Sequence, residues 1–237
     1  MSTYKHLHPF RDGLHDALGL PMVVLTGGMI GFGALAQESG FNVLEAVLAT
    51  ILIWALPGQI VLADMHAAGA NTWAIVIAVS IANLRFLPMT IAVMPHLRGG
   101  LKHQAWQLAL AQMLSANSFL YILQAVPRFS PIDRVRYFTA FVLSCVVIAV
   151  VATVGGHIAA SQMAPAVAMG FLFVNIIFIA CLLANSRAAP IIASIIIGAI
   201  AGPVCHLISP SNGILIAGII AGTAGHFMFR GHRGSPS

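Results

Sequence analysis

Two short polar motifs in strongly apolar surroundings carry groups that could hold a small solute. The first is Pro57-Gly58-Gln59, which lies within an apolar stretch over residues 42–63. Proline cannot donate a backbone hydrogen bond and clashes with the preceding helical turn, and glycine adds backbone freedom. We therefore expect a broken helix near Pro57, with freed backbone groups and the Gln59 amide available to a ligand. The alternative is a kink that serves packing alone.

The second motif is Asn83-Leu84-Arg85, within an apolar stretch over residues 71–94 and followed by Pro88. An arginine at the centre of a membrane helix costs about 2.5–3.5 kcal/mol, and no acid lies at a comparable position. A bound carboxylate is the functional hypothesis for its partner. The alternatives are a structural bond to carbonyls or extension to the membrane surface. Because Asn83 and Arg85 face opposite sides of a regular helix, and because Pro88 leaves the Leu84 carbonyl free, we expect a second break near Pro88.

Other amides and hydroxyls interrupt the apolar stretches. Most are expected to join helices through hydrogen bonds worth about 0.6–2 kcal/mol each. They are Gln37, Gln112, Ser115, Asn117, Ser118 and Asn175. Asn117 and Asn175 lie near the middle of their stretches, so both join Pro57, Gly58, Gln59, Asn83 and Arg85 as candidate substrate-binding residues.

The elements that position these residues are predicted to lie in lipid. Of 237 residues, 59% are hydrophobic and only 7% are charged, whereas soluble domains are about 25% charged. The apolar stretches are continuous and near the 20 residues that cross a ~30 Å hydrocarbon core, which favours helices over β-strands. The sequence thus predicts an all-α integral membrane protein, a polytopic helical bundle with about eight spans. The predicted spans are 17–36, 42–63, 71–94, 104–126, 135–155, 165–184, 190–208 and 212–229.

The connections between these spans are short and rich in turn residues, as at Arg98-Gly99-Gly100. We therefore expect a single transmembrane domain over residues 1–237, with a polar tail at about 230–237.

Basic residues set the predicted orientation. With the N-terminus inside, the outer side would carry only Arg98 and Lys102. The inner side would carry Lys5, Arg11, Arg128, Arg134, Arg136, Arg187, Arg230 and Arg233. This bias places both termini in the cytoplasm and the chain in the cell membrane.

Several functional classes are not expected. The net charge of +5 comes from residues that flank apolar stretches, so nucleic-acid binding is excluded. Cys145, Cys181 and Cys205 are far apart, and no metal-binding or catalytic motif occurs. We predict no metal, no cofactor and no enzymatic activity, because no nucleophile–base pair is found.

The stretch from Gly19 to Arg98 resembles the AzlC family, the large subunits of branched-chain amino-acid exporters. The resemblance rests on three ordered motifs, Gly31-Phe32-Gly33-Ala34-Leu35-Ala36, Pro57-Gly58-Gln59 and Asn83-Leu84-Arg85. It implies a secondary exporter of branched-chain or similar apolar amino acids that acts with a small AzlD-type membrane subunit.

The chain departs from the family pattern in two places. Phe86 and Pro88 stand where relatives often have histidine and tyrosine, and Ser115-Ala116-Asn117-Ser118 stands where they often have acids. Proton coupling through this later helix is therefore open. The alternatives to amino-acid export are transport or channelling of another small solute, and a scaffold subunit that does not transport.

Overall fold

The chain folds into helices grouped in two units. The computed structural model describes residues 8–84, 86–100, 103–164, 166–173, 189–208, 220 and 223–224. All regular secondary structure in these ranges is helical, which confirms the all-α prediction. The two units comprise residues 1–175 and 176–237. The prediction of one domain over the whole chain stays a prediction.

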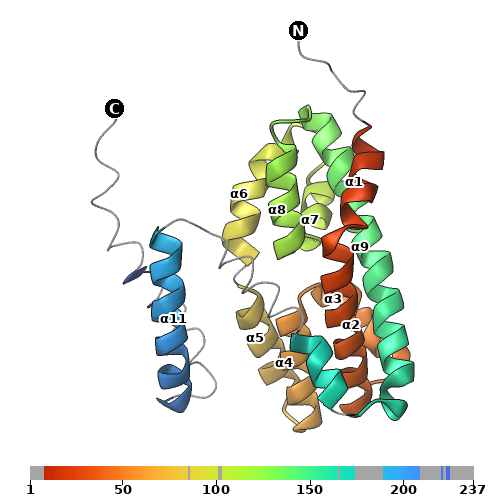
Figure 1. Cartoon of the computed structure of the whole chain (residues 1–237), viewed down its shortest axis with the longest axis vertical. Helices are drawn as coiled ribbons and strands as arrows, with labels where there is room; N and C mark the ends of the chain where they lie inside the picture. Colours follow the sequence, from red (N-terminus) through yellow and green to blue (C-terminus); the bar gives the residue numbers. More distant parts are fainter. Residues whose placement is uncertain are drawn as a thin grey trace. The chain divides into compact units, whose positions relative to one another are not determined.

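Two long helices, α2 (Leu20–Glu38) and α9 (Pro131–Ala159), run side by side through the first unit (Figure 1). Their backbones approach closely because α2 is rich in glycine. A Cβ atom at Gly33 would collide with the carbonyl oxygen of Thr153. Close approach of this kind replaces the hydrophobic effect as a source of helix association in lipid.

A separate short helix, α1 (Pro9–Ala17), precedes α2 and packs on the first part of α9. Gly13 lies against the Tyr137 carbonyl, and the Tyr137 hydroxyl donates to the Asp16 carboxylate at 2.7 Å. The sequence predicted a first span over residues 17–36. The helix that corresponds to this span, α2, begins at Leu20 and is preceded by the separate helix α1.

The predicted second span is a hairpin of two short helices, α3 (Val43–Ile53) and α4 (Leu56–Ala67). The ring of His66, in the last turn of α4, stacks on Phe41, which lies just before α3, with centroids 4.4 Å apart. Both ends of the hairpin therefore lie together. The His157 ring is hydrogen-bonded to the Phe41 carbonyl at 2.8 Å, which places these ends at the C-terminal end of α9.

The predicted fourth span is also a hairpin, formed by α7 (Gln104–Gln112) and α8 (Ala116–Ala125). Gly100, which shortly precedes α7, packs so tightly that a Cβ there would lie 2.7 Å from the carbonyl oxygen of the first residue of α9. Phe129, which follows α8, packs its ring against Tyr137. Both ends of this second hairpin therefore lie at the N-terminal end of α9, opposite the first hairpin.

The two hairpins are connected by α5 (Thr72–Asn83) and α6 (Phe86–Arg98), which bend by 55° at the break between them. In Figure 1, α3, α4 and α5 lie beside one half of α9, and α6, α7 and α8 lie beside the other half. The α5–α6 pair thus runs from one end of the unit to the other.

The number of spans differs from the predicted pattern. In the described part of the chain, two helices are long and apolar enough to cross a membrane, α2 and the Pro131–Gln162 segment, and α5–α6 makes three if it counts as one span. The prediction of about eight spans is not confirmed, because two of the predicted spans are hairpins whose ends lie on one side. The predicted spans at 165–184 and 212–229 lie mostly outside the described residues.

The second unit contains α11 (Ala189–Ile208), a 20-residue apolar helix with Pro203 inside it. This helix covers the residues of the predicted span at 190–208, but it is not among the helices counted above as long and apolar enough to cross a membrane.

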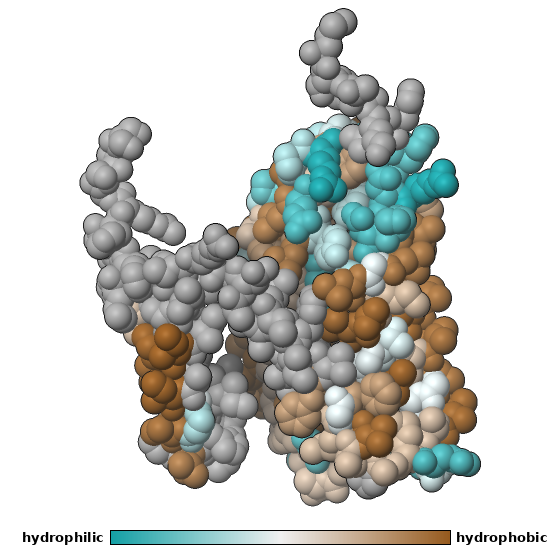
Figure 2. Space-filling model, in the orientation of Figure 1, coloured by the Kyte–Doolittle hydropathy of each residue, from teal (hydrophilic) through white to brown (hydrophobic). Residues whose placement is uncertain are grey.

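The exposed face of α9 fits contact with lipid. Leu143, Val147 and Val151 recur at helical spacing and are 57–67% exposed. Figure 2 shows apolar side chains over much of this face and hydrophilic ones gathered at the end where α1 lies. A large exposed apolar surface with a polar end is typical of a membrane protein.

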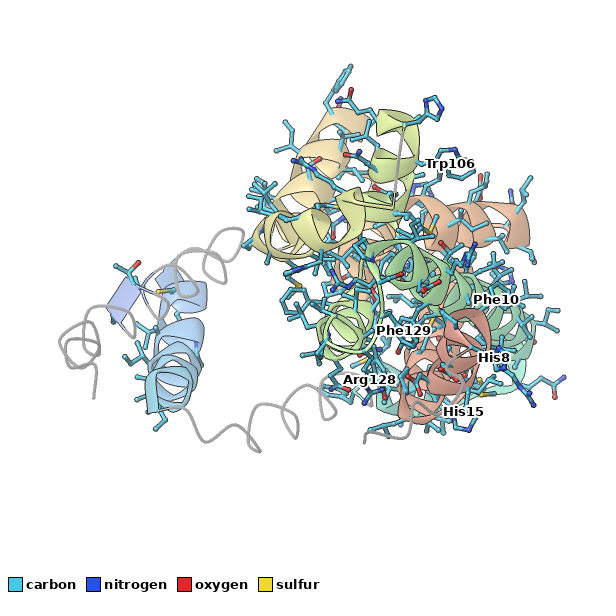
Figure 3. The ribbon with its side chains drawn as sticks, turned by 90° about the horizontal axis from the view of Figure 1, so that it is seen from above. His8, Phe10, His15, Trp106, Arg128 and Phe129 are labelled. Carbon is cyan, nitrogen blue, oxygen red and sulfur yellow. The ribbon has the colours of Figure 1, made fainter. Side chains whose placement is uncertain are left out.

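That polar end collects the described arginines. Figure 3, a view from this end, labels His8, which precedes α1, His15 of α1 and Arg128 at the α8–α9 connection. The other arginines at this end are Arg11 in α1, Arg98 at the end of α6, and Arg134 and Arg136 in the first turns of α9. The prediction that Arg98 lies on the opposite side is therefore wrong, because it counted the first hairpin as a full crossing. Lys102 lies outside the described residues.

Candidate functional site

The first helix break lies between α3 and α4, just before Pro57. Trp54 has a left-handed backbone (φ 46°, ψ 30°) and Ala55 is extended. Pro57 falls in the first turn of α4, where a missing N–H costs nothing because that donor has no helical partner. The expected break near Pro57 is thus present, and the proline starts the second helix.

The second helix break lies between α5 and α6, and here too a proline lies in the first turn of the helix that follows. α5 ends at Asn83, α6 begins at Phe86, and Pro88 lies in the first turn of α6. The expectation that the Leu84 carbonyl is free is wrong, because the backbone N–H of Leu87 donates to it at 3.0 Å.

A third break, between α7 and α8, was not expected. Ser115 caps α8: its hydroxyl accepts from the Ser118 N–H at 3.3 Å, and the Ser115 N–H donates to the Ser118 hydroxyl at 2.8 Å. These serines were predicted to join separate helices. They instead satisfy the backbone groups exposed where one helix stops and another begins.

Two reciprocal hydrogen bonds join the tips of the opposing hairpins. The indole N–H of Trp54 donates to the Met113 carbonyl at 2.9 Å, and the Gln112 amide donates to the Leu52 carbonyl at 2.6 Å. Each bond satisfies a carbonyl that a helix end leaves free. The predicted interhelical role of Gln112 is confirmed.

The start of α4 touches the end of α5. A Cβ atom at Gly58 would lie 2.6 Å from Oδ1 and 2.8 Å from Nδ2 of Asn83. The Asn83 amide therefore lies directly on the backbone of α4. Its Oδ1 atom is buried and accepts no hydrogen bond from the described residues.

Gln59 is fully buried beside this contact. Its Nε2 donates a long hydrogen bond of 3.5 Å to the Ala49 carbonyl, and its Oε1 atom has no partner among the described residues. An unsatisfied buried acceptor costs about 1–3 kcal/mol. Two such acceptors near adjacent helix breaks are typical of a site that a ligand or a second conformation completes.

An open cavity of about 540 Å³ lies among the three breaks, a volume typical of small-molecule sites, and its leucines Leu52, Leu84, Leu87 and Leu108 are 56–66% exposed. Its walls are mostly apolar and include Leu52, Trp54, Leu84, Leu87, Leu108 and Leu114. The polar lining residues are Ser80, Asn83, Thr90 and Gln112. The Ser80 and Thr90 hydroxyls donate to carbonyls of their own helices, at 2.7 and 2.9 Å. The described lining carries no charged side chain.

The predicted site residues are thus partly brought together. Asn83 lines the cavity, and Pro57, Gly58 and Gln59 lie behind it in the first turns of α4. Asn117 is half-buried in the first turn of α8 and is not among the lining residues. Arg85 and Asn175 lie outside the described residues.

Sequence reasoning missed the third break and the role of Trp54. The Ser115-to-Ser118 spacing in an apolar stretch was a usable signal, because it fits a helix cap. No local signal marks Trp54, whose partner lies far along the chain.

Comparison with known proteins confirms the predicted resemblance to the AzlC family. A protein-family model described as AzlC protein matches residues 21–163, a range that contains the three breaks and the cavity. Neither a search of curated proteins nor a search of solved structures found a match.

Proposed function

Because the chain belongs to the AzlC family, whose members are associated with membrane transport rather than catalysis, we propose that it is a secondary transporter that exports branched-chain or similar apolar amino acids. The cavity at the three helix breaks carries this proposal. It lies where discontinuous helices meet, which is a frequent place for transporter sites.

The cavity walls suit an aliphatic side chain. Leu52, Leu87 and Leu108 line it, and burial of a leucine side chain contributes roughly 3 kcal/mol at about 0.8 kcal/mol per CH₂. Asn83 adds an amide at one wall, which can serve the polar end of a zwitterion.

Arg85 is the proposed partner of the substrate carboxylate. Its chain neighbours Leu84 and Phe86 both line the cavity. A guanidinium–carboxylate pair is bidentate and stronger than a neutral hydrogen bond, which suits a solute taken out of water. Gln59, Asn117 and Asn175 stay predicted contributors.

A small AzlD-type membrane subunit is the proposed partner, and the cytoplasmic membrane is the proposed location, with both termini inside. Every described arginine lies at one end of the first unit, which supports a cytoplasmic assignment of that end.

The proposal is tested by efflux of preloaded labelled leucine from cells that express the chain with its small subunit. Arg85→Ala should lower apparent leucine affinity about 10–100-fold, because a charged hydrogen bond worth about 1.5–3 kcal/mol is lost. Arg85→Lys should retain part of it. Normal export by Arg85→Ala would remove this role from Arg85. Absence of efflux for every amino acid tested, with the complex in the membrane, would favour another solute or a scaffold subunit.

A further inference from the structure

The hairpins α3–α4 and α7–α8 are each anchored on α9. The first is held at its outer end by the His157 bond to Phe41 and, in the last turn of α3, by the Thr50–Thr153 hydroxyl pair at 3.0 Å. Both threonine side chains are fully buried, so this contact fixes α3 on α9.

The second hairpin is anchored in the same way at the opposite end. Tyr121 of α8 stacks on Phe141 of α9 with centroids 5.0 Å apart, and the Arg134 guanidinium donates to the carbonyls of Phe129 and Val126.

The two hairpins pack more on α9 than on each other. Among the described residues, no helix of one hairpin packs extensively on a helix of the other. The joint comprises the Trp54–Met113 and Gln112–Leu52 hydrogen bonds and the burial of Trp54 and Leu114 in one apolar cluster. Both donors also line the cavity, so the joint forms part of its wall.

The backbone of Trp54 is also strained, as is frequent at functional sites. Its left-handed φ of 46° is an outlier for a bulky side chain, and such strain persists only where the surroundings impose it. The indole hydrogen bond to the other hairpin and the burial of the ring in the apolar cluster hold Trp54 in place.

We propose that Trp54 and Gln112 form a gate in the wall of the open cavity between the two hairpins, and that passage of the solute through this wall requires both hydrogen bonds to open. This rests on the proposed transport function. The two residues are positioning residues: they set how often the cavity wall parts while the contacts of each hairpin with α9 stay in place.

Thiol accessibility measures the gate independently of the cargo. Thr90→Cys, in the cavity wall, serves as reporter in a chain whose three native cysteines are replaced by alanine. Trp54→Phe and Gln112→Leu each remove one donor. Each should raise the labelling rate by a membrane-impermeant maleimide about tenfold, which equals 1.4 kcal/mol.

Matched controls are available on exposed positions. Trp106, which points away from the bundle in Figure 3, and Gln104 are both exposed near the start of α7. Trp106→Phe and Gln104→Leu should leave the labelling rate unchanged. All variants are compared as monodisperse purified protein. Because Trp54→Phe and Gln112→Leu remove the two donors separately, the test still decides if one of the two variants misfolds.

Labelling that stays within twofold of the parent in both gate variants would overturn the gate. Faster labelling in the gate variants and not in the controls supports it. If labelling rises but no amino acid is exported by the parent chain, the gate stands and the proposed cargo is wrong.

Discussion

At Gly58, the absence of a side chain lets the Asn83 amide lie on the backbone of α4. A methyl group there would come within 2.6 Å of Oδ1. The contact joins the Pro57-Gly58-Gln59 motif to the Asn83-Leu84-Arg85 motif. The position of the Asn83 amide therefore depends on the size of the side chain at residue 58.

We therefore expect Gly58→Ala to push the Asn83 amide away and to destabilise the protein by roughly 1–3 kcal/mol, as overpacking does. Thermal unfolding in detergent measures this loss, and leucine efflux should fall with it. Gly155→Ala is the control, because a Cβ there meets no atom within 4 Å. Adding Asn83→Ala to Gly58→Ala should restore stability; a double variant that stays as unstable as Gly58→Ala would contradict the contact.

Local rules located both motifs, because the effects of proline and glycine act within one helical turn. Trp54 and Gln112 could not be assigned in this way. Their partner carbonyls lie 59 and 60 positions away along the chain, and only the fold brings them together.

At the scale of elements, the two hairpins are built from half-length helices. The 11 residues of α3 are roughly 16 Å long at 1.5 Å per residue, about half of a ~30 Å hydrocarbon core. Hydropathy cannot separate one full span from two apolar half-helices, because composition and total length are alike. The reversal within the predicted spans 42–63 and 104–126 was therefore not predictable from composition.

The α2–α9 pair offers a sharp test of helix packing. A Cβ at Gly156 would collide with the Ile30 carbonyl, whereas the adjacent Gly155 faces open space. Gly156→Ala should separate the helices and lower the unfolding temperature in detergent. Gly155→Ala should leave it unchanged or raise it slightly, since alanine favours a helix by up to about 1 kcal/mol. Equal effects of the two neighbours would contradict the packing.

At the scale of the whole molecule, composition alone predicted a helical membrane protein, and the family match supports it. The side of the Arg98 connection was predicted wrongly for a topological reason. When a predicted span is instead a hairpin that ends on the side where it began, every later connection lies on the side opposite to the predicted one. A second such hairpin restores the predicted sides.

The corrected topology predicts that Gly99 and the α8–α9 connection are exposed on the same side as α1. Gly99→Cys and Arg128→Cys should react with an impermeant thiol reagent from the cytoplasmic side only. Ala68→Cys, between α4 and α5, should react from the opposite side. Labelling of Gly99→Cys from outside would restore the full crossing at residues 42–63.

The central claim is that the solute binds in the cavity where the three broken helices meet. Protection of Ser80→Cys, in the cavity wall, from maleimide by leucine tests it most directly. Ile77→Cys is the control, because it is 58% exposed on the same helix and does not line the cavity. Leucine should slow labelling at Ser80→Cys and leave Ile77→Cys unchanged. Equal labelling with and without saturating leucine at Ser80→Cys, in protein that exports leucine, would place the substrate elsewhere.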